Sequence, residues 1–472
     1  MLFSSTTFLY LFLPFVLFGN FVVFRKSRTG QNVFLLFASL AFYAWGEPKF
    51  VLAMMASIAV NWFFGLMASK ARENKTAGRL ILSADVAFNL GLLFVFKYLA
   101  FAGDLVNRAF GLGLAVPKYA LPLGISFFTF QAMSYVIDVY RQKGEAQTNI
   151  LNVGLYISFF PQLIAGPIVR YETIAEQIKN RRETLDDFFN GFARFVVGLS
   201  KKVLLANGFA VVADQAFGAL KAGGNISVLF AWLGALAYTF QIFFDFCGYS
   251  DMAIGLGRMF GFHFLENFDY PYVSKSVTEF WRRWHMSLGT WFRDYVYFPL
   301  GGSRRGKGRN LLNLFTVWLL TGIWHGANTT FLVWGLMYFA LLAMEKQTGL
   351  HKKEGRAVHV ATWVYTMLFV VLGWVVFRSD SLADAARYVR CMFGLGGNAF
   401  SDGLFAGWFC QNAILLAIGT LASTPVFKSL SEKTKDSGAM GFAKAMGLFL
   451  LFVLSVSSLV SSSYNPFIYF NF

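Results

Sequence analysis

Apolar runs separated by short polar segments make up most of the chain. Runs of roughly spanning length lie near residues 7–24, 31–46, 49–68, 80–102, 119–140, 188–217, 227–247, 359–377, 403–424 and 441–461. A helix rises about 1.5 Å per residue, so about 20 apolar residues cross the roughly 30 Å hydrocarbon core of a membrane. The pattern predicts an all-α polytopic membrane protein with about 11 or 12 transmembrane helices. No long linker or internal repeat interrupts it, which favours one integral-membrane domain over residues 1–472.

Three stretches depart from this regular alternation. Residues 150–168 contain Pro161, Gly166 and Pro167, which break helices, so a re-entrant segment is expected there. Residues 170–187 carry mixed charges and predict a helix on the cytoplasmic surface. Residues 245–309 form a block that is rich in both polar and aromatic side chains. Interfacial and re-entrant helices are therefore expected beside the spans.

Composition and charge agree with a membrane location. Of the 472 residues, 56% are hydrophobic and 19% are aromatic, and the mean hydropathy is +0.53. The net charge of +16 comes from Lys and Arg dispersed in short loops between apolar runs. This distribution is typical of the positive-inside rule and does not indicate a nucleic-acid partner. The expected contact of the basic face is membrane lipid.

The charged loops also predict an orientation. Arg25–Arg28 and Lys70–Arg79 are basic and are expected in the cytoplasm, whereas Gly103–Lys118 is nearly neutral and is expected outside. The first apolar run lacks a basic leader and a cleavage signal, so we interpret it as a retained span whose N-terminus lies outside. The three cysteines are widely spaced, which indicates structural packing and neither disulfides nor a metal site.

A histidine interrupts the apolar pattern between two short runs. Residues 311–323 and 331–343 carry no charge, and thirteen residues of helix cover only about 20 Å. Gly326 and Asn328 favour a turn. The pattern predicts a hairpin with His325 at a tip below the membrane surface, where irregular backbone must be buried in protein or line a cavity. A titratable group at that depth is a functional candidate, although a core histidine bonded to a carbonyl is the alternative.

A second histidine lies in a segment that reads as a capped helix over residues 276–289. Ser276 and Glu279 have the spacing of a capping box, and the helix would place Thr278, Trp281, His285 and Leu288 on one stripe. The run Trp281–Trp284 is also typical of an interfacial anchor, with rings at the headgroups and arginines toward phosphate. For His285, catalysis and structure stay open as alternatives.

Other polar residues have weaker signals. Asp245 lies at the end of an apolar span and needs a partner; it either orients a histidine or ties broken helices together. His263, His351 and His359 lie in or beside loops and are interpreted as interface residues.

The chemistry expected at a deep histidine is base catalysis. The sequence has no G-x-S-x-G elbow, no H-E-x-x-H, no Walker A motif and no clustered metal ligands. Burial disfavours a charged imidazole, so the ring stays available as a base near neutral pH. It is then suited to removing a hydroxyl proton as the oxygen attacks a thioester, an effect of about two to four orders of magnitude in rate. No metal or prosthetic group is implied.

Five segments carry a resemblance to a known family. They are Pro122–Arg141, Phe160–Pro167, Asp245–Gly255, Glu279–His285 and Trp324–Asn328, the last of which reads Trp-His-Gly-Ala-Asn. Together they resemble the membrane-bound O-acyltransferase (MBOAT) family. The residues at both ends, Met1–Ser5 and Asn465–Phe472, look like its alginate-type branch. The match covers essentially the whole chain.

The resemblance implies a function and a site. In that family the histidine of the Trp-His-Gly motif, here His325, is catalytic, and His285 is implicated. Asp245, Trp281, Trp324 and Asn328 are then supporting or orienting candidates. It further implies a ring of helices around a central tunnel, a cytoplasmic acetyl donor (acetyl-CoA or an acyl-carrier thioester), and delivery to an exported, alginate-like polysaccharide. A periplasmic acetyltransferase partner and a bacterial inner-membrane location follow from the same resemblance.

Three other functions stay open, one of which is a purely structural scaffold for an export complex, which would leave the ester content unchanged in a His325→Ala variant. D-alanyl or other acyl transfer to a cell-envelope polymer is a close alternative, and loading assays with each donor would separate the two. A transporter or flippase is a different class, because broken helices and deep polar residues also mark transport sites. Transport would survive His325→Ala, whereas a transferase would lose its esters while polymer export continued.

Overall fold

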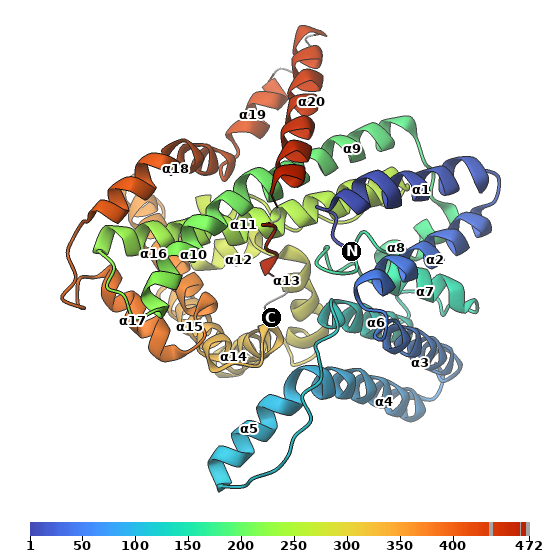
Figure 1. Ribbon diagram of the computed structural model, residues 1–472. Coiled ribbons are helices and arrows are strands. Elements are labelled where there is room, and N and C mark those ends of the chain that lie inside the picture. The colour runs from blue at the N-terminus through green and yellow to red at the C-terminus, as the bar shows by residue number, and fades with distance from the viewer. Residues whose placement is uncertain (434–437, 463, 469–472) are drawn as a thin grey trace. The chain divides into compact units, whose positions relative to one another are not determined.

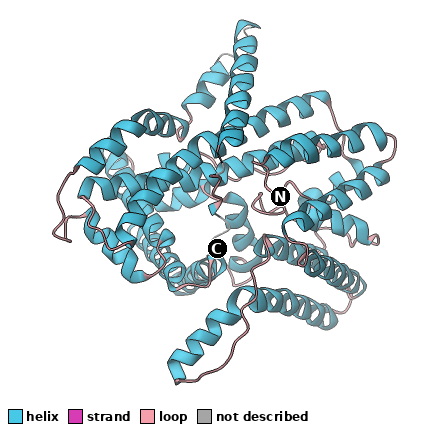
Figure 2. Cartoon of the chain, in the orientation of Figure 1, coloured by secondary structure: helices cyan, strands magenta, loops and turns pink. Residues whose placement is uncertain are grey.

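The computed structural model describes residues 1–433, 438–462 and 464–468, and these residues form helices and loops without a strand (Figure 2). Their contacts divide the chain into two compact units. Unit 1 comprises Met1–Val197 and Tyr249–Leu265, and unit 2 comprises Gly198–Gly248 and Glu266–Phe472. The all-α class is confirmed, whereas the single domain and the ring with a tunnel stay predictions.

Unit 1 begins with a continuous helical stretch that contains η1 (Phe8–Phe12), α1 (Leu13–Phe18) and η2 (Gly19–Val23). The following elements, labelled in Figure 1, are α2 (Arg28–Gly46), α3 (Val51–Lys70), α4 (Lys75–Leu93), η3 (Phe94–Tyr98), α5 (Leu99–Phe110), α6 (Ile125–Tyr140), α7 (Ile150–Ser158) and α8 (Tyr171–Asn180). Helix α9 (Leu185–Ser200) follows, and its last residues belong to unit 2.

Unit 2 continues that helix through η4 (Lys201–Ala206) into α10 (Asn207–Lys221), and α11 (Val228–Met259) returns the chain to unit 1. The remaining elements are η5 (Pro271–Val273), α12 (Val277–Arg283), α13 (Met286–Phe292), η6 (Arg293–Tyr297), α14 (Gly306–His325), α15 (Thr329–Thr348), η7 (Leu350–Lys352), α16 (Arg356–Arg378), α17 (Leu382–Met392), α18 (Gly403–Ala422), α19 (Val426–Lys433) and α20 (Gly438–Ser461).

Short polar residues start many of these helices. The side chains of Ser27, Asn74 and Asn149 accept hydrogen bonds from backbone N–H groups in the first turns of α2, α4 and α7. Such caps satisfy donors that have no partner within the helix. They place helix starts at the polar loops that separate the apolar runs, so the runs predicted from residues 31 and 80 begin three and five residues after the starts of α2 and α4. Helix α11, in contrast, continues 12 residues beyond the run predicted to end at residue 247.

The membrane-spanning character is carried by long apolar helices. Among the described residues, seven helical segments are long and apolar enough to cross a membrane, including the 36-residue segment Lys75–Phe110 and the 32-residue α11. Helix α6 has only 16 residues and is therefore too short to be counted among these seven segments. This chain is a multi-pass membrane protein, and the larger count of 11 or 12 spans stays a prediction.

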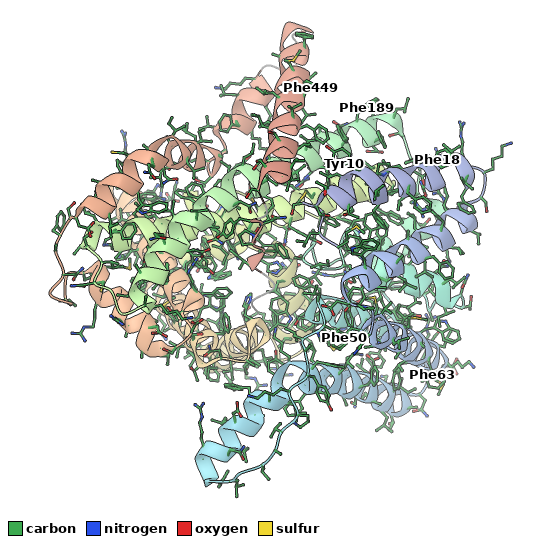
Figure 3. All side chains as sticks on the ribbon, in the orientation of Figure 1. Tyr10, Phe18, Phe50, Phe63, Phe189 and Phe449 are labelled. Carbon is green, nitrogen blue, oxygen red and sulfur yellow. The ribbon has the colours of Figure 1, made fainter. Side chains whose placement is uncertain are left out.

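Large apolar side chains on the outside of the helices support this conclusion. Tyr10, Phe18, Phe63, Phe189 and Phe449 are between 54% and 65% exposed and are labelled in Figure 3. A water-soluble protein rarely exposes so many large rings, whereas lipid-facing helices do.

Residues 150–168, the first stretch that departs from the apolar alternation, form a short helix followed by irregular backbone. Helix α7 ends at Ser158, and residues 159–169 follow as buried turns and loop. Buried irregular backbone of this kind suits a re-entrant segment. The predicted surface helix over 170–187 is shorter than expected. It ends at Asn180 because Arg181 adopts an extended conformation and its buried side chain bonds to Asn32 and to the Phe260 carbonyl.

Candidate active site

The hairpin predicted around His325 is present in unit 2. Helix α14 ends at His325 and α15 begins at Thr329, and Figure 1 shows the two helices side by side. A Cβ atom on Gly335 would lie 2.5 Å from the Trp318 carbonyl oxygen, so only glycine at this position lets α15 pack so closely against α14. Each helix has 20 residues, longer than the uncharged runs, because charged residues such as Lys307 and Glu345 are also helical. Length alone therefore does not prevent either helix from spanning.

Asn328 fixes the turn between these helices. Its Oδ1 atom accepts from the Thr330 N–H at the start of α15, and its Nδ2 atom donates to the Asp380 carbonyl at 2.8 Å. The predicted turn role of Asn328 is confirmed. Its contribution to the site is to hold the end of the hairpin against the loop after α16.

His325 lies in an aromatic environment. Its side chain is 7% exposed, and its ring centroid lies 4.9 Å from Trp324, 5.0 Å from Trp334 and 5.3 Å from Phe377. The ring borders a small cavity whose other lining residues are Ile242, Phe246, Trp284, Trp334, Trp374, Phe377 and Ile468. The histidine is therefore the titratable group of an otherwise apolar lining.

A much larger cavity of about 650 Å³ shares two lining residues, Phe377 and Ile468, with the small one. Its charged lining residues are Asp214, Lys221, Arg378, Asp380, Asp384 and Arg387. The Arg378 guanidinium pairs with the Asp214 carboxylate and lies 4.4 Å from the Phe217 ring centroid. A large cavity with both charged and aromatic lining residues thus adjoins the apolar pocket of His325 at Phe377 and Ile468.

The predicted helix over 276–289 is wrong at its centre. Helix α12 ends at Arg283 and α13 starts at Met286, and His285 between them has a left-handed backbone with φ of 45°. The predicted stripe through Thr278, Trp281, His285 and Leu288 therefore does not exist. The break is held by Asn267, whose backbone oxygen accepts from the Met286 N–H at 2.9 Å and whose Oδ1 accepts from the Ser287 N–H and hydroxyl.

Asn267 also orients the His285 ring. Its Oδ1 atom lies 3.1 Å from His285 Nδ1, and because that oxygen already accepts from the Ser287 N–H, it is the amide oxygen that faces the ring. An amide oxygen only accepts, so Nδ1 carries the proton and Nε2 has the lone pair. His285 lies outside the candidate membrane spans. Burial lowers the pKa of its imidazole to about 3, which keeps the ring neutral at physiological pH.

Trp324 lies near both histidines. Its ring centroid is 6.2 Å from that of His285 and 4.9 Å from that of His325. The His285 ring also makes an edge contact with Phe246 at 4.6 Å, and Phe246 lines the small cavity. His285 itself does not line that cavity. The structure therefore brings the two predicted histidines together through shared aromatic neighbours.

Trp284, just after α12, is buried, and Trp281 within α12 is half-buried against neighbouring rings. Trp281 contacts the rings of Trp318 and Tyr338, each at 4.8 Å, and Trp284 is 4% exposed and lies 4.8 Å from Trp374. The interpretation of these two rings as an interfacial anchor is therefore wrong. The capping prediction is confirmed, because Ser276 Oγ accepts from the Glu279 N–H at 3.0 Å.

Asp245 binds a lysine and the C-terminal segment. Its Oδ1 lies 2.7 Å from Lys202 Nζ, and its Oδ2 accepts from the Ile468 N–H at 2.8 Å. Lys202 also donates to the Pro466 carbonyl and to Asn207 Oδ1. Of the two roles predicted for Asp245, the structure describes the tie between elements. That tie holds Ile468 where it lines both cavities.

Comparisons with known proteins assign the family. The model of the membrane-bound O-acyltransferase family (MBOAT) matches residues 35–377. This chain belongs to the membrane-bound O-acyltransferase family. It is 42% identical over 495 residues to a probable alginate O-acetylase, AlgI, of Pseudomonas putida, with all of both chains covered. It is 32% identical to a peptidoglycan O-acetyltransferase of Helicobacter pylori, covering 100% of this chain and 98% of the relative.

A more distant similarity reaches a teichoic acid D-alanyltransferase of Bacillus subtilis, 28% identical over 274 residues, or 54% of this chain and 68% of the relative. Membership in the MBOAT family makes this chain an O-acyltransferase. Within the described residues no cluster of three or more His, Cys, Asp or Glu side chains has the arrangement of a metal site.

Several residues of this MBOAT site were not predicted. The sequence contained an indication for Lys202. A lysine inside an apolar run needs a counter-ion, and Asp245 is an acid in another such run. No sequence pattern indicated Asn267, because its role depends on the chain folding back beside His285. Glu345, fully buried, accepts from the backbone N–H groups of Val277 and Thr278 and so fixes the start of α12.

The left-handed backbone of His285 permits a test that separates its ring from its conformation. His285→Gly removes the ring and relieves the strain that a Cβ atom causes on a left-handed backbone, whereas His285→Ala removes the ring and keeps that strain of about 1–2 kcal/mol. If the ring assists catalysis, both variants lose at least about tenfold in acyl-transfer rate. Thermal unfolding of the purified proteins should show the alanine variant as the less stable one. A glycine variant with normal activity would reduce His285 to a turn residue.

Proposed function

We propose that this MBOAT protein moves an acetyl group from a cytoplasmic thioester donor to hydroxyl groups of an exported, alginate-like polysaccharide. The full-length similarity to probable alginate O-acetylases supports the acyl group and the polymer. The observation that carries the reaction is the position of His325, which borders a small apolar pocket adjoining a large cavity with six charged lining residues. A reacting thioester and a hydroxyl acceptor need these two different environments.

In the proposed reaction, His325 acts as the general base. The imidazole removes the proton of the acceptor hydroxyl as its oxygen attacks the thioester carbonyl. The tetrahedral intermediate then expels the thiolate, which takes the proton from His325 and leaves as the thiol. The products are an acetyl ester and the free thiol. The apolar lining excludes water, which would otherwise compete as the acceptor.

His285 and its neighbours have positioning roles in this proposal. His285, with its lone pair on Nε2, assists from a position beside Trp324. Trp324 and Trp281 keep the histidines and the hairpin in place through ring contacts, and Asn328 holds the turn. Asp245 positions Ile468 at the pocket.

The route of the substrates follows from the predicted orientation. With the N-terminus outside, in the inner membrane of a bacterium, the alternation of spans places the loop after α16 on the outer side. Asp380 and Arg387 of the large cavity belong to that side, so we assign the cavity to the acceptor. The acceptor is the polysaccharide itself or a periplasmic acetyltransferase that carries the acetyl group onward. A ring of helices in one domain, with a tunnel to His325, would admit the donor from the cytoplasm.

The proposed function predicts an ester phenotype. Deletion of the gene should remove O-acetyl esters from the exported polysaccharide, while the amount of polymer stays within about twofold of wild type. NMR of purified polymer measures the esters, and a uronic-acid assay measures export. Loss of polymer export with normal esters on the remainder would instead favour a transporter.

The donor assay discriminates acetyl from D-alanyl transfer. Membranes containing the protein receive either an acetyl thioester or a D-alanyl carrier thioester, each radiolabelled. Label in the polymer or in a membrane partner from the acetyl donor alone supports the proposal. Label from the D-alanyl donor alone would assign this chain to the chemistry of the teichoic acid relatives.

A further inference from the structure

A basic groove lies at the start of α16, apart from both cavities described above. This open groove has a volume of about 420 Å³, and its polar lining residues are Lys275, Arg356 and His359. Its apolar side is formed by residues such as Val360 and Trp363. Lys275 precedes α12 and the other four belong to the first turns of α16, so the groove joins two elements of unit 2.

The polar side of this groove contains hydrogen-bond donors without a matching acid. Lys275 Nζ lies 3.3 Å from His359 Nδ1, which leaves the other ammonium hydrogens and the far side of the imidazole for a ligand. None of the lining residues is acidic. The nearby Glu279 carboxylate accepts instead from the Lys275 backbone N–H and from Arg283. Converging donors of this kind suit a phosphate, which offers several acceptor oxygens.

The apolar side of the groove faces outward along a membrane-spanning helix. Val360 is 59% exposed, Trp363 43% and Val364 52%, and α16 is one of the candidate spans. The Trp363 Nε1 atom donates to the Tyr272 carbonyl at 3.0 Å, which fixes the ring beside the basic groups. Cations at the first turn of a span, followed by an exposed tryptophan and valines, match a lipid whose headgroup lies above its acyl chains.

We propose that this groove binds the phosphate of an anionic phospholipid, with an acyl chain along Val360 and Val364. A zwitterionic lipid carries an ammonium group that Lys275 and Arg356 would repel, so a headgroup with net negative charge is favoured. This inference goes beyond the proposed acyl transfer and does not depend on it.

The phosphate of a thioester donor is the competing source of the same chemistry. His359 lies 18 residues before Phe377 on α16, which corresponds to about 27 Å along the helix. Phe377 contacts His325. A donor with its phosphate in the groove would therefore have to extend about 27 Å to bring its thioester to His325. The exposed apolar face next to the groove favours lipid.

Native mass spectrometry of the full-length protein in detergent tests the proposal. Phosphatidylglycerol and phosphatidylcholine with identical chains are added in parallel, and the retained lipid is counted. We expect preferential retention of phosphatidylglycerol, reduced roughly 10- to 30-fold in the double variant Lys275→Gln/Arg356→Gln, as for two basic residues beside an anionic headgroup. The matched control Lys352→Gln/Lys353→Gln removes two exposed charges outside the groove and should retain the lipid normally.

Two outcomes would overturn this assignment. Equal retention of phosphatidylglycerol by the groove variant and the wild type would place the lipid elsewhere. Displacement of the lipid by coenzyme A, but not by inorganic phosphate, would assign the groove to the donor. Unfolding midpoints of both double variants within about 3 °C of wild type show that the comparison is made on folded protein.

Discussion

His325→Ala is expected to lower acyl transfer by about two to four orders of magnitude, because the hydroxyl acceptor loses the general base that we propose. The ester content of the polymer should fall to the level of the deletion strain, and the initial rate with a labelled acetyl donor should fall with it. Polymer export should continue. Protein abundance in the membrane is measured alongside, because removal of this buried ring enlarges an existing cavity and costs some stability.

A matched control for this variant is His263→Ala. His263 is exposed and lies in the loop after α11, in unit 1, whereas His325 belongs to unit 2. Its removal should leave the ester content at the wild-type level. His325→Gln adds a second comparison, since the amide fills most of the space of the ring but is not a base. Ester content above about a tenth of wild type in both His325 variants would be incompatible with general-base catalysis by this residue.

The hairpin shows how much a local pattern predicts. Gly326 and Asn328 mark the turn by their own conformational preferences, and the apolar runs on each side are helical. The position of His325 at the end of α14 follows from these nearby residues. The depth of the tip in a membrane does not, because the charged ends of both helices continue the helical structure beyond the apolar runs.

His285 shows where a local pattern fails. The capping box and the residues of 276–289 are compatible with one helix, and α12 does start as the capping box requires. The helix breaks because Asn267, eighteen residues earlier than His285, supplies hydrogen bonds that compete with the next helical turn. Side-chain periodicity contains no information on such a fold-back, so both the stripe and the anchor role of the tryptophans were wrong.

Asp245 shows an intermediate case. An acid beside an apolar run requires a partner, but the run does not say which one. Lys202 is 43 residues away, in the π-helical turn η4, and Ile468 is near the other end of the chain. The need for a cation was therefore predictable from residue type, whereas its identity depends on the packing of α11 against the preceding helix.

Breaking the pair of Asp245 and Lys202 is expected to give the largest loss of stability. Their side chains are only 2% and 3% exposed, so removing one partner leaves an uncompensated buried charge at a cost of about 3–5 kcal/mol. Asp245→Ala and Lys202→Met should each lower the unfolding midpoint of the detergent-solubilised protein strongly. Asp245→Ala also removes the acceptor of the Ile468 N–H and should lower acyl transfer in the protein that remains folded.

The double variant Lys202→Met/Asp245→Asn distinguishes the charge from the hydrogen bond. It has no buried charge at the pair, and the asparagine oxygen remains an acceptor for the Ile468 N–H. We expect its midpoint to lie above those of both single variants, because replacing a whole buried pair costs far less than removing one partner. Additive losses in the double variant would mean that the two charges do not stabilise each other. Recovery of stability without recovery of activity would assign the ammonium of Lys202, through its bond to the Pro466 carbonyl, to the placement of the C-terminal segment beside the His325 pocket.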